Sequence, residues 1–418
     1  MRRRQALLVP LALVLFRPLA AAGVARYDLV LRVDPGAETV AVEAVVDVAL
    51  APGQLSVTLL LNRGFTLASV TADRPLAAYG FRREERGRLR YAAEAAPLEV
   101  QLAEPSATAS ALRLTLAYEG AVAPDAWGVN LVTPAWVELG LYSGWFPLDP
   151  AMGAFAYHLR LGLPDGWEAV GTGGLVRKDG AWTAAAADVK DVVVVAAPHL
   201  ETRDAGGGVR VTAAGATGRR LDDVASAAAG ILGRLTALLG PAGRGGLDIV
   251  LTSRTRGGGY VRPGLAVLED DGGDLGDARW VRYLGHEIAH LWWYRAPSTS
   301  WQDWINESFA EVTALMLVRD RLGEEAWRGL LERYRTAAGG LPPIRGLDRD
   351  DDQAYEVLYR KGPVILSGVE ARIGRDEFLR FLREVHARRA ADTTMVLAAL
   401  SSVAGPGAAA DLDAALDR

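Results

Sequence analysis

Two histidines and a glutamate stand at the spacing of a metal-binding helix. The segment from His286 to His290 reads His-Glu-Ile-Ala-His, and residues i and i+4 lie on one face of a helix. Both imidazoles can therefore reach one ion, and Glu287 can accept a proton from a water held there. The chain has 5 histidines, and two of them lie in this motif. We therefore predict a metal site rather than two histidines on a helix surface.

A third ligand is available on the next predicted helix. Glu307 follows His290 after residues 291–306, and two histidines with one glutamate leave an open fourth position, as in catalytic zinc sites. Glu311 lies one turn later on the same face, where it can accept a hydrogen bond from the outer nitrogen of a ligand histidine. The alternative is a solvated stripe of glutamates. The upstream motif favours the ligand interpretation, and we predict one Zn²⁺ per chain.

The elements around these residues are expected to be mostly helical. Apolar residues recur at helical spacing beside the histidine motif, and Gly285 permits close packing there. An earlier helix is predicted to end at Gly240-Pro241. A short apolar strand is predicted over 247–251. Gly206 to Gly208 stand where the composition changes and are expected to form a linker. We predict a separate zinc domain over residues 206–418 with an α+β or α-rich fold.

The first half of the chain shows the two-residue period of β-strands. Apolar residues alternate with polar ones over 27–33 and 40–50, on either side of the turn residues Pro35-Gly36. This pattern predicts a hairpin with one buried face. Similar alternation recurs over 112–118 and 157–163. We therefore predict a multi-domain protein in which an all-β, sandwich-like domain, residues 23–205, precedes the zinc domain.

Composition limits the classes of function. The chain has 418 residues, which suggests two or three domains, and 50% hydrophobic residues, which excludes a disordered chain. A net charge of -5 argues against nucleic-acid binding. The absence of cysteine from the sequence excludes disulfides, thiolate ligands and a cysteine nucleophile.

The N-terminus has the three parts of a secretory signal peptide. Arg2 to Arg4 are basic, Ala6 to Phe16 form a short apolar run, and Ala20 to Ala22 offer small residues for cleavage. We predict a signal peptide over residues 1–22 and an exported protein, periplasmic or extracellular. The alternative is a buried N-terminal helix. No other membrane span is expected, because no later window approaches 18 consecutive apolar residues.

The sequence around the third ligand resembles a known family. Residues 304–311 read Trp-Ile-Asn-Glu-Ser-Phe-Ala-Glu, which resembles the Trp-Leu-Asn-Glu-Gly-Phe-Ala-Glu of the gluzincin metallopeptidases of the M1 aminopeptidase family. Residues 359–362 resemble that family's Tyr-x-Lys-Gly block. The resemblance implies a thermolysin-like α+β fold for the zinc domain, 206–418, and implies that Tyr359 binds the oxyanion. From the residues themselves, Glu287 is the predicted base, and Asn306 and Glu311 are candidates for supporting the zinc ligands. Tyr355, one turn from Tyr359, is a weaker candidate for the same role.

Three features depart from the family pattern. The spacing from His290 to Glu307 is two residues shorter than in the family, and no counterpart of the family's C-terminal helical domain is expected before Arg418. The family's Gly-x-Met-Glu-Asn strand, whose glutamate holds the substrate's free amine, is best matched by residues 258–262. Val261 replaces that glutamate and Arg262 the asparagine, so the amine-binding motif is degenerate. Substrate-binding candidates are Gly258, Gly259, Tyr260 and Arg262.

Three functional hypotheses follow from these residues. The first is a zinc metallopeptidase acting on a peptide or protein substrate. The second is a relative that has lost strict aminopeptidase action and cuts internally or takes N-blocked peptides. The third is a catalytically idle scaffold whose β domain binds a partner. Glu287 argues against the third, because an idle scaffold needs no base. The oligomeric state and side-chain preference stay open.

Overall fold

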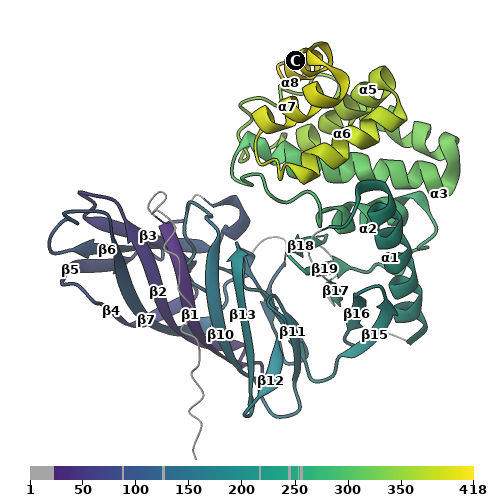
Figure 1. Cartoon of the computed structure of the whole chain (residues 1–418). Coiled ribbons are helices and arrows are strands. Elements are labelled where there is room, and N and C mark those ends of the chain that lie inside the picture. The colour runs from purple at the N-terminus through teal and green to yellow at the C-terminus, as the bar shows by residue number, and fades with distance from the viewer. Residues whose placement is uncertain are drawn as a thin grey trace, which may run out of the picture.

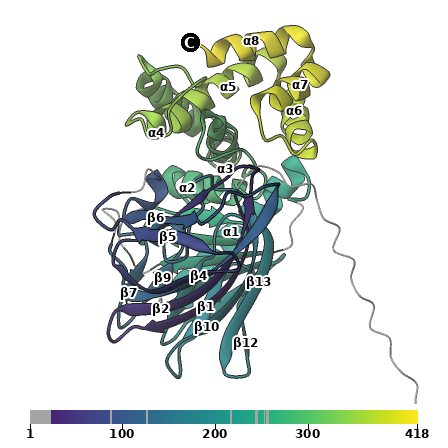
Figure 2. The ribbon, with the colours of Figure 1, turned by 90° about the vertical axis from the view of Figure 1, so that its left-hand side faces the viewer.

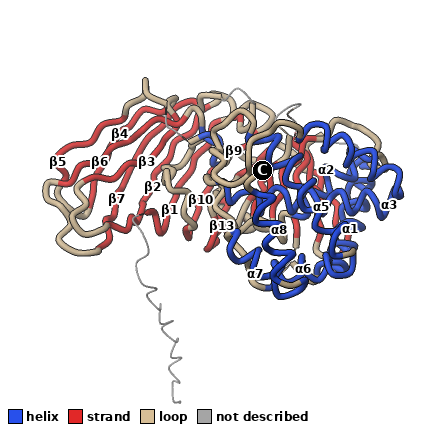
Figure 3. Tube along the Cα trace, turned by 90° about the horizontal axis from the view of Figure 1, so that it is seen from above, coloured by secondary structure: helices blue, strands red, loops and turns tan. Residues whose placement is uncertain are grey.

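The computed structural model describes residues 23–86, 89–124, 128–215, 218–242, 246–252, 254 and 258–418. The predicted signal peptide, residues 1–22, lies outside the described residues. A β-rich half leads into a second half in which helices stand above a smaller sheet (Figure 1). Seen from above, the strands of the first half lie on one side and most helices on the other (Figure 3).

The β-rich half is built around one large sheet with two smaller sheets beside it. The seven-stranded sheet has the order β12-β13-β10-β1-β2-β7-β4, the three-stranded sheet β3-β6-β5, and the four-stranded sheet β11-β14-β9-β8. The strands are β1 (Gly23–Asp34), β2 (Thr39–Leu50), β3 (Ser56–Asn62), β4 (Phe65–Ala72), β5 (Leu76–Phe81), β6 (Ala95–Leu102), β7 (Ser110–Ala121), β8 (Leu131–Val132), β9 (Val137–Leu139), β10 (Phe155–Gly162), β11 (Glu168–Gly171), β12 (Val176–Lys178), β13 (Ala181–Val189) and β14 (Val194–Ala197). Short helical turns η1 (Arg90–Ala92) and η2 (Leu141–Ser143) interrupt them.

The hairpin predicted around Pro35-Gly36 is confirmed. β1 and β2 pair antiparallel, with Val33 opposite Val40 and Leu31 opposite Val42. Inward residues of the large sheet and of the three-stranded sheet share one apolar core, to which Tyr27, Leu98 and Leu114 belong. The two-residue period in the sequence reflects this arrangement, because alternate side chains of a strand enter the core.

The second half contains a five-stranded sheet in the order β15-β16-β17-β19-β18. Its strands are β15 (Glu201–Gly206), β16 (Val209–Ala213), β17 (Leu247–Thr252), β18 (Tyr260–Arg262) and β19 (Leu265–Glu269). Gly206 and Gly208, expected in a linker, instead lie at the hairpin turn between β15 and β16. Gly206 to Gly208 have φ values of 75°, 61° and 83°, so they reverse the chain within a single sheet. The change in composition marks a turn inside the sheet that begins at Glu201.

Helices cover this sheet and form the end of the molecule opposite the β-rich half (Figure 2). They are α1 (Gly218–Leu239), α2 (Ala278–Ala289), α3 (Trp304–Ala338), α4 (Ala354–Glu356), α5 (Gly362–Ile373), α6 (Arg375–Ala387), α7 (Thr393–Ala404) and α8 (Pro406–Leu416), with short turns η3 (Trp301–Asp303) and η4 (Val357–Lys361). The fold class predicted from the sequence, a β domain followed by an α+β domain, is confirmed. Within the described part of the chain, no helix is long and apolar enough to cross a membrane.

Two buried contacts join the halves close to the site. Val193 and Val195 of the β-rich half share an apolar cluster with Tyr260 and Val267 of the second half. Beside it, Glu138 Oε1 lies 3.1 Å from Arg254 Nε, and both side chains are almost fully buried. Separating the partners of a buried ion pair is costly, so this contact favours the observed arrangement of the two halves.

Candidate active site

His286, His290 and Glu307 converge on one point. Glu307 Oε2 lies 3.4 Å from His286 Nε2 and 3.6 Å from His290 Nε2, and the ligand atoms of all three lie within 4.8 Å of one another. Atoms bound tetrahedrally at about 2.0–2.2 Å from an ion are separated by roughly 3.3–3.6 Å, so both carboxylate-to-imidazole distances fit a zinc ion. Glu307 Oε2 is also buried and has no hydrogen-bond partner among the described residues. The donor set therefore fits zinc.

Close packing of α2 on α3 brings the ligands together. Asp277 caps α2, its side chain accepting a hydrogen bond of 2.7 Å from the Trp280 backbone N–H. A Cβ atom on Gly285 would lie 2.7 Å from Leu317 Cδ1, so a larger residue there would require the Leu317 side chain to move. His286 of α2 and His290, the residue that caps its C-terminus, then face Glu307 in the first turn of α3.

Each ligand histidine is oriented through its outer nitrogen. His286 Nδ1 lies 2.8 Å from Glu311 Oε2, and His290 Nδ1 lies 2.8 Å from the Trp293 carbonyl oxygen. With both Nδ1 atoms donating, Nε2 of each ring is left to face the metal position. Glu311 therefore lies within hydrogen-bonding distance of the outer nitrogen of His286.

Glu311 is a buried carboxylate with several donors around it. Arg282 donates to Glu311 Oε1 at 2.8 Å, and the Tyr334 hydroxyl also donates to that oxygen. Burial raises the pKa of Glu311, but its contacts with His286 and Arg282 outweigh this and hold it at about 2. Burial lowers the pKa of His286, whereas Glu307 and Glu311 raise it to about 10 in the metal-free protein. Glu311 is therefore ionised near neutral pH, and its negative charge stabilises a positively charged ion held by His286.

Glu287 lies on α2 between the two ligands and lines the pocket. Burial raises its pKa above the usual range for a glutamate, although the two imidazoles partly oppose this. A carboxylate with a raised pKa is a better proton acceptor near neutral pH. The position and surroundings of Glu287 therefore suit general-base chemistry.

Tyr359 packs against the first ligand. Its ring stacks on the His286 ring with centroids 5.2 Å apart, and it comes from η4, a π-helical turn. Burial raises the pKa of the Tyr359 hydroxyl well above its usual range, so the hydroxyl stays protonated and can donate a hydrogen bond. Tyr355 stacks on the far side of Tyr359 at 4.4 Å and is 44% exposed. Tyr359 is thus the tyrosine that lies beside the metal position.

Asn306 supports the loop between the helices. Its Oδ1 accepts a hydrogen bond of 3.1 Å from the Ala296 N–H, and its Nδ2 donates to the Ala296 carbonyl at 3.0 Å and to Asp303 at 2.7 Å. Its amide is therefore committed to the segment that joins α2 to α3. Asn306 acts on the loop rather than on a ligand histidine.

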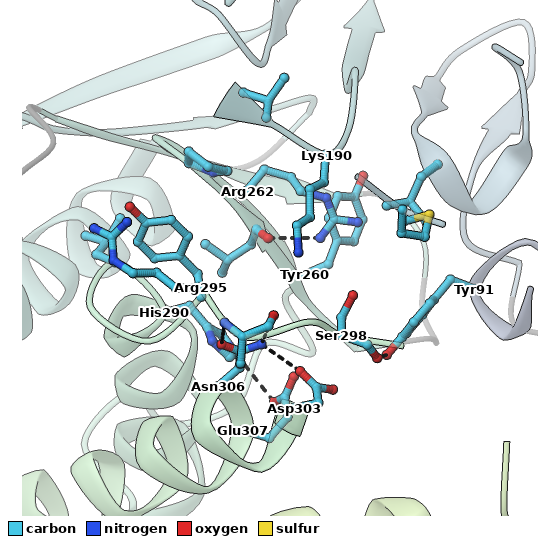
Figure 4. Close-up of a pocket in the computed structure, with 18 of the residues that line it drawn as sticks. Tyr91, Lys190, Tyr260, Arg262, His290, Arg295, Ser298, Asp303, Asn306 and Glu307 are labelled. Carbon is cyan, nitrogen blue, oxygen red and sulfur yellow. Dashed lines mark hydrogen bonds and ion pairs between the residues drawn. The ribbon is translucent and has the colours of Figure 1, made fainter. Parts of the chain in front are cut away.

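A pocket of about 510 Å³ opens beside the three ligands, between the two halves of the molecule. Tyr91 and Lys190 reach it from the β-rich half, and Figure 4 shows Lys190 across the cavity from Asp303 and Glu307. The candidate segment at 259–262 lines the pocket, whereas Gly258 is absent from the lining. Of the four substrate-binding candidates, Gly259, Tyr260 and Arg262 therefore border the cavity.

Arg262 is held in place by its neighbours. Its Nε lies 2.6 Å from Asp191 Oδ2, and Asp191 is 1% exposed. The guanidinium also lies 5.3 Å from the ring centroid of Tyr142 and 5.0 Å from that of Tyr260. Its charge is neutralised by Asp191 and screened by two aromatic faces. Arg262 consequently forms an ion pair with Asp191 at the pocket wall and is not a free cation.

The acidic residues Glu269, Asp270 and Asp271, at the end of β19, do not supply a carboxylate in place of the amine-binding glutamate. Asp270 pairs with Arg220, and Glu269 Oε2 accepts a hydrogen bond of 3.0 Å from the Gly258 N–H. Asp271 pairs with Arg279. None of the three acidic residues is among the described residues that line the pocket.

Several pocket residues could not be found from motifs. Arg349 lies 2.8 Å from Asp303 Oδ2 and donates a hydrogen bond of 2.8 Å to the Tyr91 hydroxyl, which links the two halves across the pocket. Lys190 lies between β13 and β14. The only sequence feature that could have pointed to Lys190 is the rarity of lysine, which occurs only at positions 178, 190 and 361.

No family model matches the sequence. The fold is similar to the crystal structure of an M1 zinc metallopeptidase from Deinococcus radiodurans, with a TM-score of 0.71, 18% identity and coverage of 95% of this chain and 94% of that chain. A mutant of that protein bound to a Tyr-Ser-Ala substrate aligns with a TM-score of 0.70, 19% identity and the same coverage. Leukotriene A4 hydrolase from Saccharomyces cerevisiae aligns with a TM-score of 0.70 and 16% identity, over 94% of this chain and 66% of that chain. The chain therefore has the two-domain fold of M1 zinc metallopeptidases.

Proposed function

We propose that this protein is a zinc-dependent metallopeptidase that hydrolyses peptide bonds. The observation that carries the proposal is the convergence of His286, His290 and Glu307 on one point, with Glu287 beside them in a pocket of about 510 Å³. The fold supports it, because the similar structures are zinc metallopeptidases, one of them described with a bound Tyr-Ser-Ala substrate. Glu287 also argues against an idle scaffold, because binding a partner requires no buried base.

The residues divide the reaction between them. A zinc ion held by the three ligands would act as a Lewis acid and lower the pKa of water from 15.7 to about 7. Glu287 accepts the proton of the attacking water and later gives it to the leaving amine. The Tyr359 hydroxyl donates a hydrogen bond to the oxygen on which negative charge develops. Glu311 keeps the His286 ring in the orientation that this chemistry needs.

The backbone of β18 suits an extended peptide. β18 is at the edge of the five-stranded sheet, and its residues 260–262 line the pocket. An edge strand presents N–H and C=O groups with which an extended peptide can pair, and in β18 the Val261 carbonyl already accepts a hydrogen bond of 2.9 Å from Arg262 Nη1. A substrate bound along β18 would therefore pass the metal position in a defined register.

The side chains of this strand do not favour a free amine. Val261 has no charge, and Arg262 is already bound to Asp191. An α-ammonium group placed here would find no carboxylate supplied by β18. We therefore propose weak release of N-terminal residues from unblocked peptides and tolerance of acylated ones.

Cleavage-site mapping by mass spectrometry on a mixed peptide pool tests the proposal. The zinc-loaded protein is expected to cut peptides, and Glu287→Gln is expected to keep its zinc and lose cutting by about 10²–10⁴ fold. A pool left intact by zinc-loaded wild type, or cut equally by both proteins, would refute it. Hydrolysis rates are then compared for one peptide with a free N-terminal amine and for the same peptide acetylated. Much faster hydrolysis of the free-amine peptide would establish ordinary aminopeptidase action.

A further inference from the structure

The carboxylates that line the pocket are mostly engaged. Among the described lining residues they are Asp188, Glu287, Asp303 and Glu307. Glu287 and Glu307 belong to the proposed centre, and Asp303 is 1% exposed and bound by Arg349 and Asn306. Asp188 is exposed to solvent. The interior of the pocket therefore offers no carboxylate that is both free and buried for binding a cation.

Cations are more numerous among the described lining residues, which include Lys190, Arg262, Arg295, Arg349 and Arg389. Arg262 and Arg349 are each held by an aspartate, whereas Lys190 is not. Among the described residues, no oxygen forms a hydrogen bond or an ion pair with the Lys190 ammonium. Asp303 and Asp188 favour its charge only at longer range. Lys190 is thus a pocket cation with hydrogen-bonding capacity left over, and Nη2 of Arg262 is also without a hydrogen-bond partner among the described residues.

Lys190 is also directed into the cavity. Figure 4 shows its side chain extending from the β-rich half toward the region of Tyr260 and Arg262, on the far side of the cavity from Glu307. Its neighbour Asp191 is fixed by Arg262 and by the Leu141 N–H at 2.8 Å, so the base of the lysine is anchored. Partial burial withdraws the ammonium from water and, with a weaker contribution from the charge of Arg262, lowers the pKa of Lys190.

An anion in contact with Lys190 would offset the free-energy cost of keeping its ammonium charged in a partly buried position. A carboxylate supplies the acceptors that the ammonium lacks, and a hydrogen bond between charged groups in a partly buried site is stronger than one in water. An α-ammonium group in the same place would instead meet a like charge.

We propose that Lys190 binds a carboxylate of the substrate, so that the pocket selects peptides with an anionic group beside the scissile bond. This rests on the proposed peptidase function and names the chemistry its substrates share. Three groups supply such a carboxylate: a dicarboxylic acyl group on the N-terminus, an acidic side chain, or the C-terminus. Lys190 is in this sense a specificity-determining residue.

Matched peptide pairs identify the source of the carboxylate. The pairs are N-succinyl against N-acetyl, a glutamate against a glutamine next to the cleaved bond, and free C-terminus against amide. Wild type is expected to favour the anionic member of at least one pair by about tenfold in kcat/KM, the effect of one charged hydrogen bond. Lys190→Met is expected to abolish that preference, and Lys190→Glu to reverse it. Lys178→Met, which changes an exposed lysine on β12, should leave it unchanged.

A binding measurement separates this inference from the peptidase proposal. The zinc-loaded Glu287→Gln protein is titrated with the same pairs by calorimetry, with and without Lys190→Met. If wild type cuts no peptide but the Lys190-dependent preference in affinity remains, the peptidase function fails and the inference stands. If no pair shows a preference in either assay, or if Lys190→Met retains it, Lys190 does not bind a substrate carboxylate.

Discussion

The His286 Nδ1 atom and the Glu311 Oε2 atom lie 2.8 Å apart, and this contact joins α2 to α3 at the candidate metal centre. Glu311 is one turn after Glu307, so a single helix supplies both a ligand and the carboxylate that orients another ligand. His286 and Glu311 are almost fully buried. The geometry of the candidate metal centre therefore depends on how α2 packs against α3.

Glu311→Gln should weaken zinc binding by about 10–100 fold, because the amide retains the shape but loses the charge that supports the His286 ring. Competition with a zinc chelator measures the affinity. Glu325→Gln, an exposed change on the same helix, is the control and should bind zinc as wild type does. Equal affinity in all three proteins would show that Glu311 does not support the ligand.

Glu311 should also make the metal-free protein sensitive to acid. Its pKa in the fold is about 2, below the ordinary value of 4.5, so its ionised form stabilises the folded state above pH 4.5. That contribution to the free energy of unfolding is lost as pH falls from 4.5 toward about 2. Urea unfolding across this range should show the difference between wild type and Glu311→Gln shrinking with falling pH. A difference that stays constant would contradict the lowered pKa.

Tyr359→Phe should lower kcat by about 10²–10³ fold while zinc content is unchanged, because one donor to the developing oxyanion is removed. KM should change little, since the hydroxyl acts mainly in the transition state. Tyr355→Phe is the matched control, because that ring stacks on Tyr359 but is 44% exposed. A kcat retained in Tyr359→Phe would exclude the hydroxyl from catalysis.

Asp191→Asn should destabilise the protein by about 3–5 kcal/mol, because it leaves Arg262 with an uncompensated charge in a buried position. Asp248→Asn breaks the ion pair with the more exposed Arg210 and should cost about 0–1 kcal/mol. Thermal and urea unfolding compare the two. Adding Arg262→Met to Asp191→Asn should recover part of the loss, and no recovery would show that the charge is not the cause.

Local regularities made much of the fold predictable. Alternate residues of β1 and β2 enter the core, so the hairpin around Pro35-Gly36 follows from a two-residue period. The meeting of His286 and His290 follows from the helical period in the same way. The hairpin turn at Gly206 to Gly208 was less predictable, because three flexible residues suit a linker and a tight turn equally well.

The sequence by itself determined the elements and the set of candidate ligands, because both depend on residues a few positions apart. Only the tertiary structure decided what the pocket wall presents. Arg262 reads as a free cation in the sequence, yet Asp191, 71 positions away, neutralises it. Lys190 belongs to no motif, yet packing of the two halves brings its ammonium into the cavity. Charge at a site is a sum over neighbours in space, and those neighbours come from segments that the local pattern of the chain does not connect.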